Sequence, residues 1–191
     1  MKTKPTVAGL VLLVTAMLVS VCGAQENKLD AKALGEITFV SPESLAAKKY
    51  LGLTDKQKFS LGQIKAEIIF LEIFSMYCPV CQKDAPTVNK LFALIEAEPN
   101  LKNSVRFVGV GTGNTPYEVE VFRKKFNINF PLFPDDEFVI QKAFSQDIRT
   151  PTFVLARVKA GNQLEILKVR IGEIKDAQEF FHSISQLLSS K

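Results

Sequence analysis

The feature that most constrains the fold is the run IIFLEIF, residues 68–74, which ends four residues before the first of two cysteines spaced C-P-V-C. Every residue of this run except Glu72 is Ile, Leu or Phe. A short apolar run of this kind predicts a central strand that is buried on both faces. Such a strand would deliver Cys78 to the start of the following helix and place one carboxylate in apolar surroundings.

Strand and helix patterns alternate along the rest of the chain, which predicts an α/β fold with helices on the faces of one sheet. Before the run, Ser41 as N-cap and Pro42 at the first helical position predict a short helix that ends at Gly52. A capping box between Thr115 and Glu118 predicts the start of another helix. From residue 68 the predicted order is strand, helix, strand, helix, strand, helix, strand, strand, helix, over residues 68–74, 78–96, 105–111, 115–126, 128–133, 135–144, 151–158, 163–171 and 176–188.

The N-terminal residues 1–24 have the pattern of an export signal. Two lysines precede a neutral, largely apolar run, residues 7–21, and small residues follow it. The run is shorter than the roughly 20 apolar residues of a membrane-spanning helix. Cleavage after Ala24, lipid attachment at Cys22 and retention as an anchor remain three alternatives. Each of them predicts a periplasmic or otherwise extracytoplasmic protein.

The remaining 165 or so residues suit one domain with its own core. Residues 25–36 are polar and mixed, so we expect a tether or a loosely packed lead-in there. The net charge of the 191-residue chain is +4, and it falls to +2 without Lys2 and Lys4. A charge this small and evenly spread favours neither a nucleic-acid partner nor an anionic membrane surface. Any membrane contact is expected only through the N-terminal signal or its lipid.

The C-x-x-C pair predicts either half of a zinc site or a dithiol–disulfide couple. A structural zinc site needs four ligands. This chain has no second cysteine pair, and its single histidine, His182, lies far along the sequence on a predicted helix, where it is an ordinary helix residue. A disulfide between Cys78 and Cys81 closes almost no loop and would add little stability. We therefore predict redox chemistry, with no metal and no cofactor other than that disulfide.

The start of the predicted helix assigns different roles to the two cysteines. Cys78 would face unpaired backbone N–H groups and the positive end of the helix dipole, which favour the nucleophilic thiolate. Cys81, one turn deeper, would attack the mixed disulfide and release the partner. Pro79 removes one N–H and Val80 adds no charge, so the thiolate gains less stabilisation. These two residues favour a reductant over an oxidant, although the helix terminus alone does not decide the direction.

These residues also carry a resemblance to a known family. The segment EIFSMYCPVCQKDAP (residues 72–86), with TPTF (150–153) about seventy residues after the cysteines, resembles the thioredoxin superfamily. More narrowly, it is similar to the exported thiol-disulfide oxidoreductases of the TlpA/ResA type. The resemblance implies a thioredoxin-like fold, with a central mixed β-sheet, helices on both faces and an extra strand-helix insertion between Ile128 and Phe144. It implies a lead-in over residues 25–58 and a thioredoxin-like domain over residues 59–191.

The resemblance also implies how partners bind. Pro86 matches the proline that kinks the active-site helix, and Thr150-Pro151 matches the cis-proline loop beside the cysteine pair. We expect Thr150 and Pro151, together with Pro79 and Val80, to form the surface that binds substrate. Protein thiols and disulfides are the implied partners, and a membrane thiol carrier is the expected electron donor. The chain departs from the family in having no Trp, so the surface around the cysteines has a different shape.

Two carboxylates complete the predicted site. Glu72 lies six residues before Cys78, where thioredoxins carry a buried acid. Burial would raise its pKa and suit it to accept a proton from Cys81, whereas at an edge position it would reach water instead. Asp84 is three residues after Cys81, on the same helix face. It is either an acidic modulator of the pair or a solvated surface residue.

Two other classes of function compete with this prediction. A copper chaperone of the same fold would resemble its relatives in a C-x-x-x-C spacing with a distant His ligand, and the spacing here is one residue shorter. A non-catalytic interaction module would use the groove around Pro151 without needing Cys78. The stretch GVGTGN, residues 109–114, lacks the G-x-G-x-x-G spacing and does not predict a nucleotide site.

Overall fold

The computed structural model describes residues 29–54, 57–144 and 148–189. The predicted export signal, with Cys22, lies outside these residues. Within the described ranges no helix is both long enough and apolar enough to cross a membrane.

Five strands form a central mixed sheet in the order β5-β4-β3-β6-β7. The middle strand, β3, runs parallel to β4 and antiparallel to β6, while β5 and β7 form the two edges. All seven residues of β3 are buried, as the apolar run predicts. The strands are β3 (Ile68–Phe74), β4 (Val105–Thr112), β5 (Leu132–Asp135), β6 (Thr152–Val158) and β7 (Leu164–Ile171).

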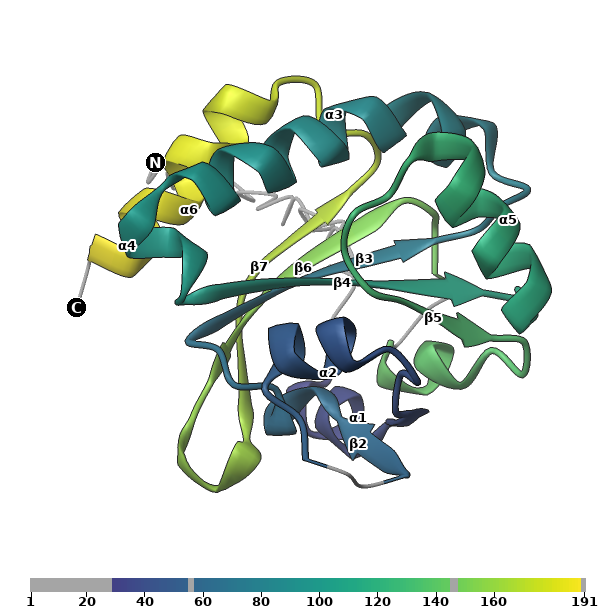
Figure 1. Cartoon of the computed structure of the whole chain (residues 1–191), viewed down its shortest axis with the longest axis horizontal. Coiled ribbons are helices and arrows are strands. Elements are labelled where there is room, and N and C mark those ends of the chain that lie inside the picture. The colour runs from purple at the N-terminus through teal and green to yellow at the C-terminus, as the bar shows by residue number, and fades with distance from the viewer. Residues whose placement is uncertain (1–28, 55–56, 145–147, 190–191) are drawn as a thin grey trace, which may run out of the picture.

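Helices cover both faces of this sheet (Figure 1). One face carries α3, α4, α5 and α6, and the other carries α1 and α2 with the 3-10 helices η1 and η2. The predicted thioredoxin-like architecture, with a mixed sheet and helices on both faces, is confirmed. The helices are α1 (Ala31–Glu36), α2 (Leu45–Leu51), η1 (Leu61–Gln63), α3 (Pro79–Ala97), α4 (Pro99–Lys102), α5 (Pro116–Phe126), η2 (Val139–Ala143), η3 (Ala160–Asn162) and α6 (Ala177–Ser189).

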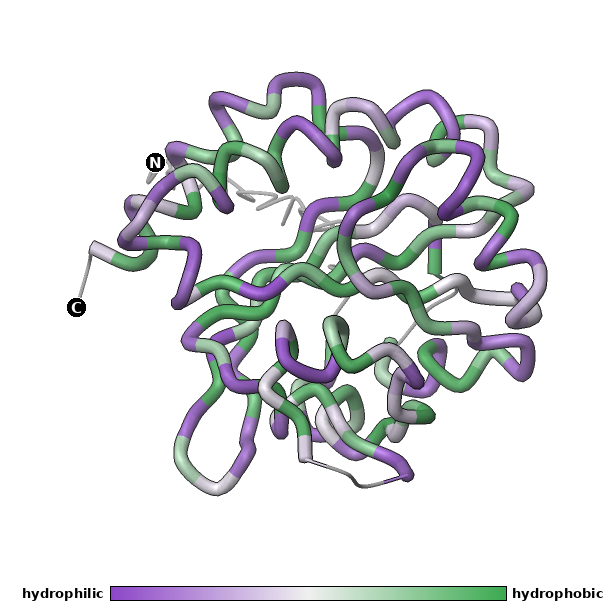
Figure 2. Tube along the Cα trace, in the orientation of Figure 1, coloured by the Kyte–Doolittle hydropathy of each residue, from purple (hydrophilic) through white to green (hydrophobic). Residues whose placement is uncertain are grey.

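The alternation of side chains along β3 divides the core into two layers. Phe70 and Phe74 pack toward α3, α5 and α6, whereas Leu71 and Ile73 pack toward α1 and α2. Because strand residues alternate between faces, Glu72 points to the same side as Phe70 and Phe74. Figure 2 shows the apolar stretches concentrated in the interior and the polar ones on the outer helix surfaces. The carboxylate of Glu72 is therefore directed under the helix that carries the cysteines.

The helix predicted from Ser41 begins three residues later than expected. Strand β1 (Thr38–Val40) pairs antiparallel with β2 (Lys58–Ser60), a small sheet that the sequence did not predict. The Ser41 N–H extends this pairing by donating to the carbonyl of Gln57 at 2.9 Å. Ser41 is therefore not the N-cap, and Pro42 is not the first helical residue. Ser44 caps α2 instead, while the predicted end at Gly52 is correct, with a left-handed φ of 65°.

The described part of the expected loose lead-in, residues 29–36, contains a capped helix that packs on the core through Leu34. Asp30 caps α1 by accepting from the N–H groups of Lys32 and Ala33. Leu34 on α1 is fully buried, and the Asp30 N–H donates to the carbonyl of Ala143. The predicted division between residues 58 and 59 falls inside β2, so the lead-in and the central sheet share one core.

The insertion between residues 128 and 144 differs from the predicted strand and helix. The strand β5 begins at Leu132 rather than at Ile128. The expected helix over residues 135–144 is the short 3-10 helix η2, because Phe138 adopts a left-handed φ of 54° that interrupts any helix starting at Asp135. Asp135 still caps the turn, since its carboxylate accepts from the N–H groups of Val139 and Ile140 at 2.6 and 3.2 Å.

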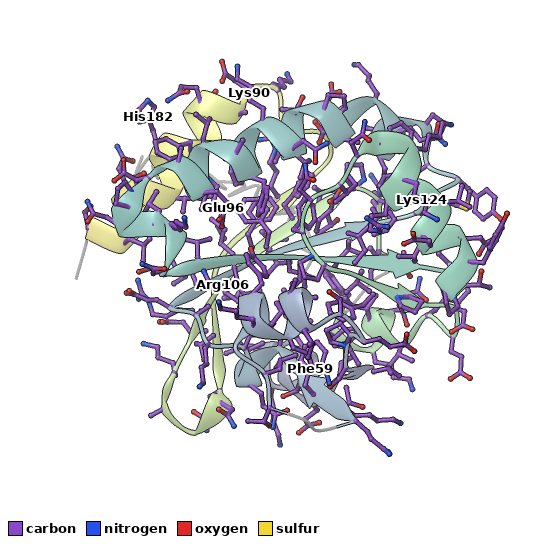
Figure 3. All side chains as sticks on the ribbon, in the orientation of Figure 1. Phe59, Lys90, Glu96, Arg106, Lys124 and His182 are labelled. Atoms are coloured by element: carbon purple, nitrogen blue, oxygen red, sulfur yellow. The ribbon has the colours of Figure 1, made fainter. Side chains whose placement is uncertain are left out.

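Polar side chains join the layers at the end of the sheet opposite the cysteines. Arg106 on β4 extends toward α2 in Figure 3 and donates to the carbonyl of Tyr50 at 2.5 Å. The Tyr50 hydroxyl accepts from the Phe107 N–H at 2.8 Å, so α2 satisfies a backbone donor that no neighbouring strand reaches. His182 is exposed on the outer side of α6, consistent with an ordinary helix residue.

Candidate active site

The cysteines lie where β3 ends and α3 begins, at the edge of the sheet where the parallel strands β3 and β4 both terminate (Figure 1). Cys78 is the N-cap of α3, and Pro79 occupies the first helical position. The Cys81 N–H donates to the Cys78 sulfur at 3.2 Å. This sulfur thus fills the capping role that a side-chain oxygen has in most helices.

Cys78 is partly exposed and faces the loop before β6. Its sulfur lies 3.2 Å from the Thr150 carbonyl oxygen, to which the thiol form donates. The Thr150–Pro151 peptide bond is cis, as the resemblance implied. Burial opposes ionisation, yet hydrogen bonds from the Cys81 thiol, the Thr150 side chain and the N–H groups of Cys81 and Val80 outweigh it. They hold the pKa of Cys78 below its ordinary value.

Cys81 has the opposite environment. Its side chain is fully buried within α3. Burial, the hydrogen bond with Cys78 and the charges of Cys78 and Glu72 all raise the pKa of its thiol. The two sulfurs therefore differ in environment: Cys78 is accessible and its thiol has a lowered pKa, whereas Cys81 is buried and its thiol has a raised one.

Glu72 lies in the middle of β3, paired in register with Gly109 of β4 and Phe153 of β6. The residue is 1% exposed, so the alternative of an edge position in contact with water is wrong. Its Oε2 atom has no hydrogen-bond partner among the described residues. Burial, followed by the charges of Asp84 and Cys78, raises the pKa of Glu72 to about 8. The carboxyl group can therefore exchange a proton near neutral pH.

Asp84 is buried at 3% exposure, so the solvated alternative is wrong for this residue as well. Its Oδ2 atom accepts from the Ile174 N–H at 2.9 Å, which ties α3 to the loop before α6. Burial is the main reason that the pKa of Asp84 is raised, and the hydrogen bond from Ile174 opposes it. Asp84 thus combines a structural link with an electrostatic effect on Glu72.

The exposed surface around Cys78 is apolar. Pro79 and Val80 lie in the open at the start of α3, and Val80 is 42% exposed. Tyr77, which directly precedes Cys78, is exposed as well, and its hydroxyl donates to Glu118. Pro86 lies inside α3, at the position that the resemblance assigned to the kink. Within the described part of the chain, no group of three or more His, Cys, Asp or Glu side chains could hold a metal ion.

Sequence reasoning missed three residues that hold the turn before Cys78. Asn114 accepts from the Met76 N–H, Gln82 donates to the Met76 carbonyl, and Glu118 accepts from the Tyr77 hydroxyl. One signal was available for Asn114, because it follows β4 and the carboxyl ends of parallel strands meet at the edge where α/β proteins build their sites.

Comparison with known proteins identifies the family. The profile of the AhpC/TSA family matches residues 43–157, which is more than half of the chain. The chain belongs to this family. The match spans both cysteines, Glu72 and the Thr150–Pro151 loop, so the functional edge of the sheet lies inside it.

Relatives of known activity agree with the chemistry of the site. The chain is 23% identical over 141 residues to the thiol-disulfide oxidoreductase ResA of Geobacillus thermodenitrificans, covering 74% of this chain and 78% of that protein. It is also 23% identical over 139 residues to ResA of Bacillus subtilis, covering 73% and 74%. The predicted superfamily and the predicted enzyme class, a thiol-disulfide oxidoreductase, are confirmed.

Solved structures show the same fold. A secreted disulfide oxidoreductase of Mycobacterium tuberculosis, homologous to DsbE of E. coli, matches with a TM-score of 0.55 at 19% identity over 81% of this chain and 98% of its own. StoA of Bacillus subtilis matches with a TM-score of 0.51 at 24% identity over 67% and 89%.

The buried carboxylate makes a prediction about stability. The pKa of Glu72 is about 8 in the fold against an ordinary value of 4.5. Between these values the unfolded chain releases a proton that the folded chain keeps, so the free energy of unfolding falls as pH rises through this window. Glu72→Gln has no carboxyl group to titrate at this position, so its free energy of unfolding does not fall for this reason. Its stability relative to wild type should rise from pH 4.5 to pH 8, by an amount on the order of a few kcal/mol.

Urea unfolding followed by circular dichroism at pH 4.5, 6 and 8, with a reductant present, measures the difference. Glu43→Gln, at an exposed position, controls for the loss of one carboxyl group. If the free energy of unfolding changed equally with pH in wild type and in Glu72→Gln, Glu72 would titrate at its ordinary value and the prediction would be wrong.

Proposed function

We propose that this protein is an exported thiol-disulfide oxidoreductase that reduces disulfides of protein partners through Cys78 and Cys81. The redox-active pair serves as its only cofactor. One observation supports this most strongly, namely the asymmetry of the pair. Cys78 is accessible with a lowered pKa, and Cys81 is buried with a raised one.

The first step is attack by the Cys78 thiolate on one sulfur of the partner disulfide. The partner S–S bond breaks, a bond forms between that sulfur and Cys78, and the second partner sulfur leaves as a thiolate that takes a proton from water. The Thr150 carbonyl, 3.2 Å from the Cys78 sulfur, and the adjoining Pro151 border the place where the partner segment must lie. Pro79 and Val80 provide the exposed apolar surface on the opposite side.

The second step needs the Cys81 thiolate, and Glu72 accepts its proton. The charge of Cys78 helps to raise the pKa of Glu72. Once Cys78 is in the mixed disulfide, this charge is absent, so the pKa of Glu72 falls and its ionised, proton-accepting form becomes more populated. Cys81 then attacks the Cys78 sulfur and releases the partner as a dithiol. The partner gains two electrons, and the protein is left with the Cys78–Cys81 disulfide.

The proposed direction of electron transfer, from this protein to its partners, rests on how the start of α3 stabilises the Cys78 thiolate. Although burial opposes ionisation, hydrogen bonds hold the pKa of Cys78 below its ordinary value, but Pro79 offers no N–H at the first helical position and Val80 carries no charge. The thiolate, and with it the reduced form, is therefore less stabilised than it would be with a full set of donors, which favours a reducing couple. A reductant outside the cytoplasm must be recharged, and we propose a membrane thiol carrier as its donor. The N-terminal signal pattern supports this location, and one solved structure with the same fold is that of a secreted disulfide oxidoreductase.

Mixed-disulfide trapping tests the proposed activity. In bacteria that export the full chain, Cys81→Ser cannot complete the second step, so partner proteins should accumulate on Cys78. Acid quenching, alkylation of free thiols and non-reducing electrophoresis with mass spectrometry identify the adducts. Cys78→Ser is the matched control, because it removes the accessible thiol and should trap far fewer partners. An empty Cys81→Ser trap, or equal trapping by both variants, would contradict a protein-disulfide substrate.

The reduction potential tests the direction. Equilibrating the purified protein with dithiothreitol or glutathione buffers should give a value near or below about −250 mV for the Cys78–Cys81 couple. A value above about −180 mV is typical of an isomerase or an oxidant. Such a value would mean that the missing N–H at Pro79 does not weaken the thiolate as proposed.

A further inference from the structure

The turn that joins β3 to α3 is held at both peptide groups of one residue, Met76. The Met76 N–H donates to the Asn114 Oδ1 atom at 2.8 Å. The Met76 carbonyl accepts from the Gln82 Nε2 atom at 2.7 Å. The backbone two residues before the nucleophile is thus fixed by side chains from two separate elements.

Asn114 is well anchored for this task. It is fully buried in the loop between β4 and α5. Its own N–H donates to the Gly111 carbonyl at 3.1 Å, and its carbonyl accepts from the Asp135 N–H at 3.3 Å. Its Nδ2 atom lies 3.4 Å from the Ser75 hydroxyl. Asn114 therefore contacts the ends of β4 and β5 through its backbone and the turn that carries Cys78 through its side chain.

Gln82 reaches the turn from the other side. It follows Cys81 in the first turns of α3, and its backbone N–H donates to the Cys78 carbonyl at 3.1 Å. Its side chain then returns to Met76, two residues before the helix cap. The Gln82 side chain therefore links the first turn of α3 to the backbone of Met76 in the preceding turn.

We propose that Asn114 and Gln82 are positioning residues, which together hold the Ser75–Cys78 turn so that the Cys78 sulfur lies within reach of the N–H groups at the start of α3. This rests on the proposed role of Cys78 as nucleophile. The Cys81 N–H reaches that sulfur at 3.2 Å, and hydrogen bonds weaken steeply as distance and angle depart from their optimum. A turn free to shift by a few tenths of an ångström would lose part of this interaction.

The ionisable groups around Cys78 come from several elements, and neither Asn114 nor Gln82 is one of them. Cys81 on α3 and Glu72 on β3 interact with its charge directly. Glu118 on α5 accepts a hydrogen bond from the hydroxyl of Tyr77, the residue before Cys78. A change in the ionisation of Cys78 in these variants would therefore report its position and not a lost charge.

The test compares Gln82→Met and Asn114→Ala with Asn89→Ala. Asn89 is a matched control, because its Nδ2 atom also donates to a backbone carbonyl, that of Phe126, at 2.8 Å, and ties α3 to α5 away from the cysteine turn. The readout is the rate of Cys78 alkylation by iodoacetamide as a function of pH. In both test variants we expect the pKa of Cys78 to rise by about 0.5 to 1 and the rate at acidic pH to fall roughly three- to tenfold. Asn89→Ala should match wild type.

Two results would overturn the proposal. One is a pH profile of alkylation in Gln82→Met that does not differ from that of wild type. Because Gln82 is only partly buried, this variant tests the proposal even if Asn114→Ala, at a fully buried position, fails to fold. The other is an equal shift in Asn89→Ala, which would indicate general loosening of α3. Alkylation requires no protein partner, so either result is distinguishable from an empty Cys81→Ser trap.

Discussion

The burial of one carboxyl group in the apolar middle strand is the constraint on which the proposed mechanism depends. Glu72 has almost no contact with water, and its neighbours across the sheet are Gly109 and Phe153. Keeping a charge there is costly without a partner, so the group favours its protonated form. Because its pKa lies near neutrality and depends on the charge of Cys78, its proton affinity changes as the reaction proceeds. A carboxylate at a hydrated position would lack this coupling.

The two cysteines use one helix terminus in different ways. Cys78 caps α3 and receives its N–H groups, whereas Cys81 points into the core beside Glu72. The bond from Ile174 to Asp84 holds this end of α3 against the loop before α6. This bond connects the helix that carries both cysteines to a segment ninety positions away in the sequence.

Local signals predicted the parts of the structure that are determined locally. The apolar run predicted β3 and, by its end, placed Cys78 at the start of a helix, and the Thr115–Glu118 capping box predicted the start of α5. The errors arose where distant segments decide. Ser41 looks like an N-cap, but its backbone pairs with Gln57 in a sheet that only the fold creates. For Asp84 the sequence left a modulator of the pair and a solvated residue as alternatives, because its partner Ile174 lies ninety positions away.

The most direct test is the titration of Glu72 itself. The carboxyl carbon of a selectively ¹³C-labelled glutamate, assigned by comparison with Glu72→Gln, reports its ionisation by NMR as pH is varied in the reduced protein. The structure predicts a midpoint near 8, and a lower one after Cys78 is blocked by alkylation. A midpoint near 4.5, the ordinary value, that does not respond to the state of Cys78 would contradict the role of Glu72 as the proton acceptor for Cys81.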